Sequence, residues 1–263
     1  MTVLDTTLPA PISVEDVPVV ELRRYALVPG QRETLIELFD REFVETQEAA
    51  NIKMIGQFRD LGRPDTFVWL RGFASMDARR QALGSFYDGP VWARHRNQAN
   101  ATMVSSDDVL LLKPAWPGSG FDLTDATRPV AARPAANDAR LTNPASERLL
   151  ASISIEIHHL EPDAGPDFAS SYRALAVPAL REASACLLGA YLTEPAENTF
   201  PRLPVRENEN VFVSVIGLNR RPDRQDSAST VPDLSSLPGS GRFVFARTIE
   251  TLWLSPTSRS LLR

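Results

Sequence analysis

Strand-like and helix-like hydrophobic patterns alternate along the first hundred residues. Residues 19–27 are rich in β-branched and large apolar side chains and end at a Pro-Gly pair, which predicts a strand and a turn. In residues 31–50 the period changes, because Leu35, Phe39 and Phe43 stand four apart. This spacing gives a helix one apolar stripe and leaves its charged residues to water. The chain therefore opens with a strand followed by a helix.

Two more strands, a second helix and a last strand are predicted next. Residues 52–58 and 66–73 are apolar and flank RDLGRPD, a connection that suits an antiparallel hairpin. Ser75 is placed to cap a helix that a Gly-Pro pair interrupts and residues 91–103 resume. Residues 109–112 form a short strand. The order β-α-β-β-α-β is that of the ferredoxin-like motif, with both helices on one face of a four-stranded antiparallel sheet.

The same phrases return in the second half of the chain. ELRRYALVPG is echoed by EIHHLEPDAG, which aligns Glu21 with Glu156, and FVWLRGF is echoed by FVSVIGL, which aligns Phe67 with Phe212. The predicted elements here are a strand from residue 153, a helix over 167–184 that Pro178 kinks or divides, and strands over 187–193, 211–218 and 248–254. Residues 219–240 are polar and proline-containing where the first half has its second helix, so the second unit is predicted to be degenerate. Whether these residues form that helix stays open.

We therefore predict an α+β protein with two tandem ferredoxin-like units in a dimeric α/β-barrel-like arrangement. The predicted organisation is a flexible tail over 1–17, a first unit over 18–115, a linker over 116–148, a second unit over 149–256 and a tail over 257–263. A sheet with helices on one face leaves its other face apolar, and the second unit offers the same kind of face. The two units are expected to pair within one chain as a sandwich or closed barrel. Pairing between two chains, as a homodimer, is the alternative.

Three phrases of the first unit occur in a characteristic order: ELRRYALVPGQRETLIELF, GQFRDLGRPDTFVWLRGFASMDAR and GPVWARHRNQANATMVSSDDVLLLKPA. With them, most of residues 19–115 resembles the NIPSNAP family of the dimeric α/β-barrel superfamily. The closing LWLSPTSRSLL is similar to the C-terminal phrase of bacterial tandem members. Relatives in the superfamily include cofactor-independent monooxygenases and haem-degrading enzymes. The resemblance therefore implies a pocket for a small aromatic or haem-like molecule.

Composition narrows the classes of partner and compartment. The net charge of -5 and the lack of basic runs argue against nucleic acid. Cys186 is the single cysteine, which excludes an internal disulfide and favours a reducing compartment. The acidic N-terminus has no signal-like pattern, and no window approaches the roughly 18 apolar residues of a membrane helix. We expect a cytoplasmic protein without a membrane span. Since phosphate-loop, HExxH, GxSxG and calcium-loop motifs are missing, we predict no cofactor and no metal.

Histidines supply the candidates for acid-base chemistry. His158 and His159 are adjacent in a predicted strand and point to opposite faces, so they cannot share one metal ion. Trp92 and His95 are three apart on a helix, which places an aromatic ring beside a titratable group. His95 is the candidate catalytic base. The structural alternative is that Trp92 belongs to the core and His95 is its exposed edge.

The candidate substrate-binding residues are Tyr25, Trp69, Arg71, Trp92 and His158. A guanidinium can hold a carboxylate or an anionic substrate, whereas an aromatic side chain on a strand packs in a core by default. Two functions stay open. The first is binding of a small aromatic or otherwise apolar molecule in a barrel pocket, with cofactor-independent oxygenation as the reaction that the resemblance implies. The second is a non-enzymatic interaction or scaffold module, which a barrel filled by side chains would favour.

Overall fold

Eight strands close into one barrel in the computed structural model, within the residues that it describes, 17–130, 152–218 and 245–263. The strands are β1 (Val19–Leu27), β2 (Lys53–Asp60), β3 (Thr66–Phe73), β4 (Met103–Pro114), β5 (Ser152–His159), β6 (Ala185–Thr193), β7 (Val211–Leu218) and β8 (Glu250–Pro256). Around the barrel their order is β1-β3-β2-β8-β5-β7-β6-β4, and all neighbours are antiparallel. The predicted α+β class is confirmed, and the two sheets form a closed barrel rather than an open sandwich.

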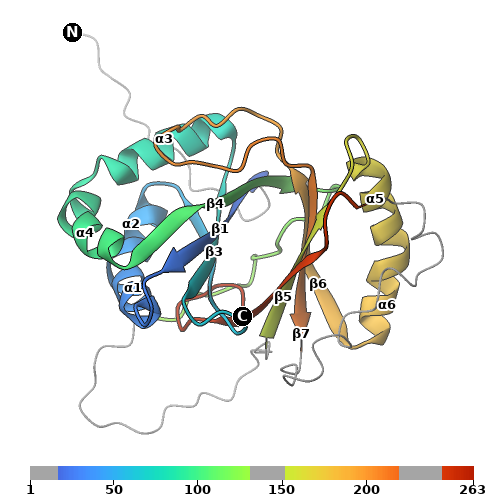
Figure 1. The fold of residues 1–263 in the computed structure, drawn as a ribbon, viewed down its shortest axis with the longest axis horizontal. Coiled ribbons are helices and arrows are strands. Elements are labelled where there is room, and N and C mark those ends of the chain that lie inside the picture. Colours follow the sequence, from blue (N-terminus) through green and yellow to red (C-terminus); the bar gives the residue numbers. More distant parts are fainter. Residues whose placement is uncertain (1–16, 131–151, 219–244) are drawn as a thin grey trace, which may run out of the picture.

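Helices cover the outside of the barrel on two opposite sides (Figure 1). They are α1 (Arg32–Leu38), η1 (Phe39–Phe43), α2 (Val44–Ala49), α3 (Met76–Tyr87) and α4 (Pro90–Ala101) in the first half, and α5 (Gly165–Ser171), η2 (Tyr172–Ala176) and α6 (Val177–Glu182) in the second. The helices predicted over 31–50 and 167–184 are therefore each interrupted by a π-helical segment, η1 or η2. Pro178 is tolerated because it stands in the first turn of α6, where its missing N–H is not needed.

Local signals set most of the element bounds in the first half. The Ser75 side chain caps α3 as predicted, because it accepts a hydrogen bond of 3.0 Å from the Ala78 N–H. The last strand is longer than the predicted residues 109–112, since β4 begins at Met103. Residues 105–108 of this strand are polar, yet Ser105 and Asp108 pair with β1. Backbone pairing with a long neighbour extends this strand where its apolar pattern has already ended.

Each half contributes four neighbouring strands in an equivalent order. The first half gives β4-β1-β3-β2 and the second gives β8-β5-β7-β6. Two seams join them: β2 pairs with β8 and β4 with β6, each through three residue pairs. The seams are short in comparison with the eight pairs between β1 and β3. The barrel therefore closes within one chain. That the halves are a tandem repeat stays a prediction.

The pairing register of the strands aligns the two halves differently from the sequence comparison. The difference is two residues. Glu21 pairs with Arg71, and Ser154 pairs with Ile216 at the corresponding place. With FVWLRGF aligned to FVSVIGL as before, Glu21 therefore corresponds to Ser154 and not to Glu156. A shift of two residues keeps every side chain on the same face of the sheet. The sequence alignment of the two strands therefore assigned the faces correctly, although its register was wrong by two residues.

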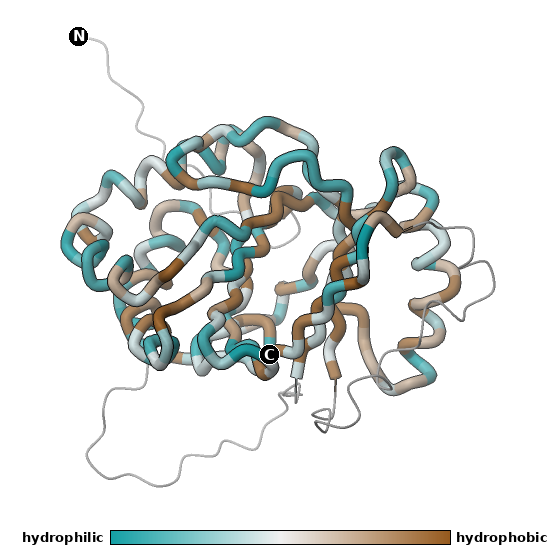
Figure 2. Tube along the Cα trace, in the orientation of Figure 1, coloured by the Kyte–Doolittle hydropathy of each residue, from teal (hydrophilic) through white to brown (hydrophobic). Residues whose placement is uncertain are grey.

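Apolar side chains from both halves fill the barrel interior. They include Val20, Leu22, Val68, Leu70, Leu110, Leu112, Ile153, Ile155, Ile157, Val213, Val215, Leu252 and Leu254. Figure 2 shows the corresponding hydrophobic runs along the strands. This interior buries the two apolar sheet faces against each other, as the pairing argument predicts. The barrel centre is therefore a packed core. A barrel filled by side chains is what we expect if the protein is a non-enzymatic interaction or scaffold module.

Segments predicted as linker and tail also pack against the barrel where they are described. Phe121 and Leu123, within 116–130, are buried against the interior, and Leu262 donates its N–H to the Ile55 carbonyl at 3.0 Å. The predicted domain boundaries stay predictions, and residues 219–240 lie outside the described residues. Of the described helices, none is long and apolar enough to span a membrane.

Candidate functional site

A buried charge cluster lies between the sheet and the helices of the first half. Glu21, fully buried on β1, accepts hydrogen bonds from three fully buried guanidiniums. The distances are 2.7 Å from Arg23 Nη1 and 2.7 Å from Arg71 Nε, both to Oε2, and 2.6 Å from Arg79 Nε to Oε1. The strand alternation of β1 and β3 places the first three of these residues on the helix side, and α3 supplies Arg79. One carboxylate is thus shared by three cations.

Neutral groups complete part of this cluster. Arg23 Nε donates to the Tyr25 hydroxyl at 3.2 Å, and Arg71 Nη1 donates to Gln47 Oε1 at 3.1 Å. Arg79 Nη1 donates to Asn198 Oδ1 at 3.0 Å. These partners orient the guanidiniums without adding negative charge.

The cluster has more donors and more positive charge than its own residues satisfy. Three guanidiniums and one carboxylate leave a net charge of 3 − 1 = +2 in a region that water does not reach. Within the described part of the chain, the buried Nη2 atoms of Arg23, Arg71 and Arg79 have no hydrogen-bond partner, and neither has the buried Trp69 Nε1. A buried donor without a partner costs about 1–3 kcal/mol, and more when it is charged. All four unpaired groups are donors, so an acceptor-rich group would complete the site.

Electrostatics keep the central carboxylate ionised. Burial alone would raise the pKa of Glu21, but the charges of Arg71, Arg23 and Arg79 outweigh it and hold that pKa well below its usual range. Burial lowers the pKa of Arg79, against the opposing effect of Glu21. Burial also raises the pKa of the Tyr25 phenol, so this group stays neutral at physiological pH. Glu21 is therefore a fixed counter-ion and a poor base.

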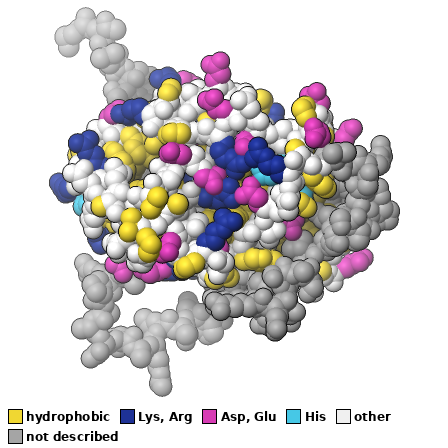
Figure 3. Space-filling model, in the orientation of Figure 1, with side chains coloured by type: hydrophobic (Ala, Val, Ile, Leu, Met, Phe, Trp, Pro, Cys, Tyr) yellow, Lys and Arg dark blue, Asp and Glu magenta, His cyan; other side chains and the backbone are white. Residues whose placement is uncertain are grey.

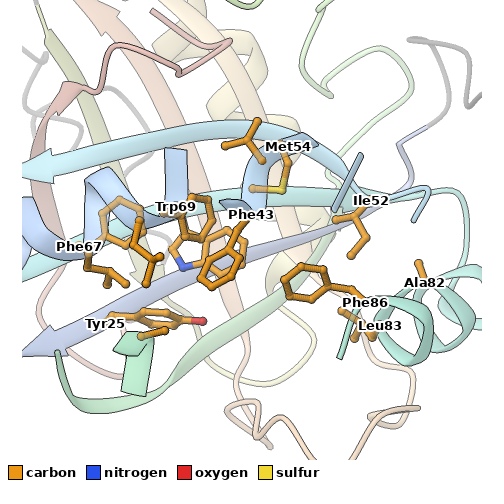
Figure 4. Packing of buried hydrophobic residues seen from close by; sticks show 14 of the residues in the cluster. Tyr25, Phe43, Ile52, Met54, Phe67, Trp69, Ala82, Leu83 and Phe86 are labelled. Atoms are coloured by element: carbon orange, nitrogen blue, oxygen red, sulfur yellow. The ribbon is translucent and has the colours of Figure 1, made fainter. Parts of the chain in front are cut away.

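Aromatic rings pack beside the cluster, and Figure 4 shows Tyr25, Phe43, Trp69 and Phe86 together in the hydrophobic core of the first half. The Arg71 guanidinium carbon lies 4.9 Å from the centre of the Trp69 ring, and that of Arg23 lies 5.4 Å from the same ring. Such cation-π contacts stabilise a positive charge that is removed from water. The surroundings of the unpaired donors are therefore both dry and aromatic.

The connection between β6 and β7 closes over this site from the second half. Thr199 donates from its hydroxyl to the Met76 carbonyl at 3.0 Å, and Phe200 packs into the aromatic core of the first half. The connection also forms a half-open hollow of about 790 Å³, lined mainly by residues 193–209, among them Asn198, together with Leu110 and Leu111 of β4. Asn198 therefore stands between this hollow and Arg79.

The structure brings three of the predicted substrate-binding residues together. Tyr25, Trp69 and Arg71 all belong to the cluster or its wall. Trp92 is half-buried next to Phe43, with ring centres 5.7 Å apart, on the same aromatic wall. The fifth, His158, lies on the other half against Phe168. The assignment of these residues to a ligand stays a prediction.

The proposed base His95 lies at the outer edge of the aromatic wall. Its Nε2 is 3.5 Å from a carboxylate oxygen of Glu42, and its ring centre is 6.4 Å from that of Phe43. These contacts join it to the helices η1 and α4 rather than to the guanidiniums. Its role as a base stays a prediction.

Four residues of the cluster were not among the predicted site residues: Glu21, Arg23, Gln47 and Arg79. Strand alternation was a usable signal for Glu21, Arg23 and Tyr25, because charged and polar residues at every second position of a buried strand must meet. Arg79 lies on a helix far along the chain, and no local pattern relates it to this strand.

Arg24 points to the other side of β1 and takes part in a different charged group at one end of the barrel. Its guanidinium contacts Glu250 at 2.6 Å and Asp108 at 2.7 Å, and His159 Nε2 lies 2.7 Å from Glu250. Arg206 joins through Asp108 at 3.4 Å. Basic, acidic and histidine side chains gather in the middle of the face shown in Figure 3. Positive and negative charges are matched here, unlike in the buried cluster.

Metal ligation finds no support in the described part of the chain, where no group of three or more His, Cys, Asp and Glu side chains is placed to hold an ion.

Comparison with known proteins relates the first half to a family and the whole chain to a fold. The sequence model of the NIPSNAP family matches residues 20–116. A NIPSNAP family protein from Agrobacterium tumefaciens is 24% identical over 38% of this chain and 87% of its own, with a TM-score of 0.35. No curated protein matches the chain significantly.

Two solved structures share the overall fold across nearly the full chain. A candidate monooxygenase from Lactobacillus acidophilus is 10% identical over 92% of this chain and 94% of its own, with a TM-score of 0.52. Another, from Fusobacterium nucleatum, is 9% identical over 92% and 93%, with a TM-score of 0.51. At such identities the likeness concerns the fold alone.

Proposed function

We propose that residues 20–116, which match the NIPSNAP family model, bind a small aromatic molecule carrying an anionic group, such as a carboxylate or an ionised phenol. The proposed site is the buried cluster between the sheet and the helices of the first half. One observation carries the proposal: within the described residues, four buried donors without partners belong to one cluster, in which two positive charges lack a counter-ion. An anion satisfies both the donors and the charge.

The chemistry of the surroundings narrows the ligand class. Arginine forks are suited to planar oxyanions, which they bind through two parallel hydrogen bonds. Trp69 Nε1 adds a neutral donor, and the rings of Tyr25, Phe43 and Phe86 provide apolar walls. These contacts therefore favour a ring with an anionic substituent over a purely apolar molecule.

The proposed location differs from a pocket in the barrel centre, because apolar side chains occupy that centre. Access would run through the hollow of about 790 Å³ that the connection between β6 and β7 forms, where Asn198 contacts Arg79. Displacing Asn198 and its neighbour Thr199 would bring a ligand oxygen next to Arg79. The second half would then act as the cover of a site built by the first.

Cofactor-independent oxygenation is a second candidate, favoured by the same donors because this chemistry requires a stabilised substrate anion. One atom of dioxygen would become a carbonyl oxygen of the product and the other would leave as water, while the substrate would supply the two hydrogens and the four electrons. A base is also needed, but Glu21 is held ionised and Tyr25 neutral. We therefore favour binding of a molecule that is already an anion over oxygenation. A scaffold that binds no ligand is the remaining alternative.

Calorimetric titration with 3-phenylpropionate tests the proposal, with 2-phenylethanol as a neutral analogue. The Arg79→Gln variant removes one unpaired donor and one excess charge while Glu21 keeps two partners. We expect the wild type to bind the anion in preference to the alcohol, and Arg79→Gln to bind it on the order of 10-fold more weakly. Arg80→Gln, a neighbouring exposed arginine on α3, is the matched control.

Equal binding by Arg79→Gln and Arg80→Gln would contradict the proposed site. No binding of any aromatic anion by the wild type would favour the scaffold alternative. Oxygen uptake with an electron-rich phenol, measured with an oxygen electrode, separates oxygenation from binding alone.

A further inference from the structure

A second buried polar group occupies the corresponding place in the other half of the chain. On the helix side of β5 and β7 lie Ser154, Glu156, His158 and Ser214, and the helical segment η2 places Tyr172 over them. All five are buried, with exposed fractions of 0% for His158 and both serines, 4% for Tyr172 and 8% for Glu156. These positions correspond to those of the first cluster, because Glu156 on β5 is equivalent to Arg23 on β1 when the two halves are aligned by their strand pairing.

Most polar atoms of this second group lack partners. Among the described residues, the hydroxyl oxygens of Ser154, Ser214 and Tyr172 and the two ring nitrogens of His158 have no partner with hydrogen-bond geometry. The Ser214 hydroxyl is nevertheless close enough to Tyr172 to lower the pKa of its phenol in part. His158 Nε2 lies 3.4 Å from a Glu156 oxygen, but this contact lacks hydrogen-bond geometry. Unpaired polar atoms on four neighbouring side chains are unusual in a native core and call for water or a ligand.

The two groups have opposite chemistry. The first offers only donors and excess positive charge. The second offers a carboxylate, three hydroxyl oxygens and an imidazole, all of which can accept a hydrogen bond. Among the described residues, no Lys or Arg pairs with Glu156, and its charge raises the pKa of the Tyr172 phenol in addition to the effect of burial. A buried carboxylate without a basic partner favours a cation as its ligand.

Aromatic rings around the carboxylate support the same class of ligand. The Phe168 ring centre is 5.1 Å from that of His158, and the Tyr172 ring centre is 4.7 Å from that of Phe212. Aromatic faces attract ammonium groups, and the attraction grows when water is excluded. The π-helical segment that carries Tyr172 is also a feature that recurs at functional sites.

We propose that Glu156, His158, Tyr172, Ser154 and Ser214 form a second ligand site, which binds the protonated amino group of a small aromatic or alkyl amine. An ammonium group has three donors and no acceptor, so it complements this set as an anion complements the first. Its charge is neutralised by Glu156, and its hydrogen bonds go to oxygens or to the imidazole acceptor. The site does not depend on the proposed function of the first half.

Titration with 2-phenylethylamine tests the inference, with 3-phenylpropionate and 2-phenylethanol as probes of the same shape but different charge. We expect the wild type to bind the amine in preference to the alcohol. Glu156→Gln keeps the shape and removes the charge, and it should weaken amine binding on the order of 10- to 100-fold. Tyr172→Phe removes only an unpaired hydroxyl, so it should weaken binding several-fold with an unchanged or higher unfolding midpoint.

Cross-controls separate this site from the first one. Arg79→Gln should leave amine binding unchanged, and Glu156→Gln should leave binding of 3-phenylpropionate unchanged. Failure of the wild type to bind the amine at millimolar concentration would overturn the inference, and so would equal affinity for the amine and the alcohol. Unchanged amine binding by both Glu156→Gln and Tyr172→Phe would also overturn the inference. So would a crystal structure, determined in the presence of the amine, in which only ordered water occupies the site.

Discussion

Arg79 on α3 donates a hydrogen bond of 3.0 Å to Asn198, which lies in the connection between β6 and β7. The contact joins a helix of the first half to a loop of the second. Thr199, next in the chain, holds the same helix through the Met76 carbonyl. The buried cluster, whose four charged residues all belong to the first half, is therefore covered by residues more than a hundred positions away.

Replacing Gln47 by Glu should separate stability from ligand binding. Gln47 is buried and accepts from Arg71 at 3.1 Å, so a carboxylate there would lower the excess charge from +2 to +1. We expect the free energy of unfolding to rise by about 1 kcal/mol, because a charge-assisted hydrogen bond replaces a neutral one. Affinity for 3-phenylpropionate should fall. Urea unfolding and calorimetry measure the two effects, and a variant that is destabilised would argue against excess charge in this cluster.

Replacing Glu21 by Gln should have the largest effect on stability. It leaves three buried guanidiniums without a counter-ion, which we expect to cost about 3–5 kcal/mol in urea unfolding. The folded-state pKa of Glu21 is lowered, so its contribution is present above the unfolded pKa of about 4.3 and is lost as the pH falls below it. The difference from wild type should be constant from pH 8 to pH 5 and shrink in stronger acid. Asp107→Asn, at an exposed position, is the control.

Asp40 should make the protein more stable as the pH falls, in contrast to Glu21. Burial raises its pKa to about 6, and the nearby charges of Arg259 and Arg59 offset this only in part. Because the unfolded pKa is about 3.9, the folded state takes up a proton first, and stability should increase as the pH falls from 7.5 to 5. Asp40→Asn should remove this gain, which is on the order of 1 kcal/mol after allowance for partial exposure. Urea unfolding at the two pH values measures it, and an identical pH response of the variant would contradict the assignment.

Glu250 should contribute stability at the end of the barrel. Burial tends to raise its pKa, but hydrogen bonds from Arg24 and His159 lower it to about 2. Glu250→Gln should therefore lower the free energy of unfolding by about 1 kcal/mol near pH 7, since the group is partly exposed. The difference should persist down to the unfolded pKa of about 4.3 and disappear as the pH approaches 2. Glu161→Gln, at an exposed position, should show neither effect.

Much of the fold was predictable because local patterns determine it. The bounds of β1, β3 and β7 agree with the apolar runs from which they were predicted, and Ser75 marks the start of α3. The π-helical segments were not predictable, since they are interruptions of one helix and not separate patterns. The register between the halves also needed coordinates, because strand alternation repeats every two residues and allows a shift of two without changing the face.

The candidate site was predictable only in part. Tyr25, Trp69 and Arg71 were chosen for their chemistry and share a strand pair, so the structure brings them together. His158 was chosen with them but belongs to the other half, because the chain repeats its strand order and separates equivalent positions across the barrel. Arg79 and Asn198 reach the cluster only through tertiary packing, for which one sequence carries no local signal.

Closure of the barrel within one polypeptide has a consequence for its chemistry. In a barrel formed by two identical subunits, every substitution occurs in both sheets, and both must tolerate it. Here the four strands of each half are encoded separately, so Arg23 and Glu156 can occupy matching positions with opposite charges. Barrel closure is also a first-order process, so dilution should not open the two seams as it would dissociate a pair of subunits.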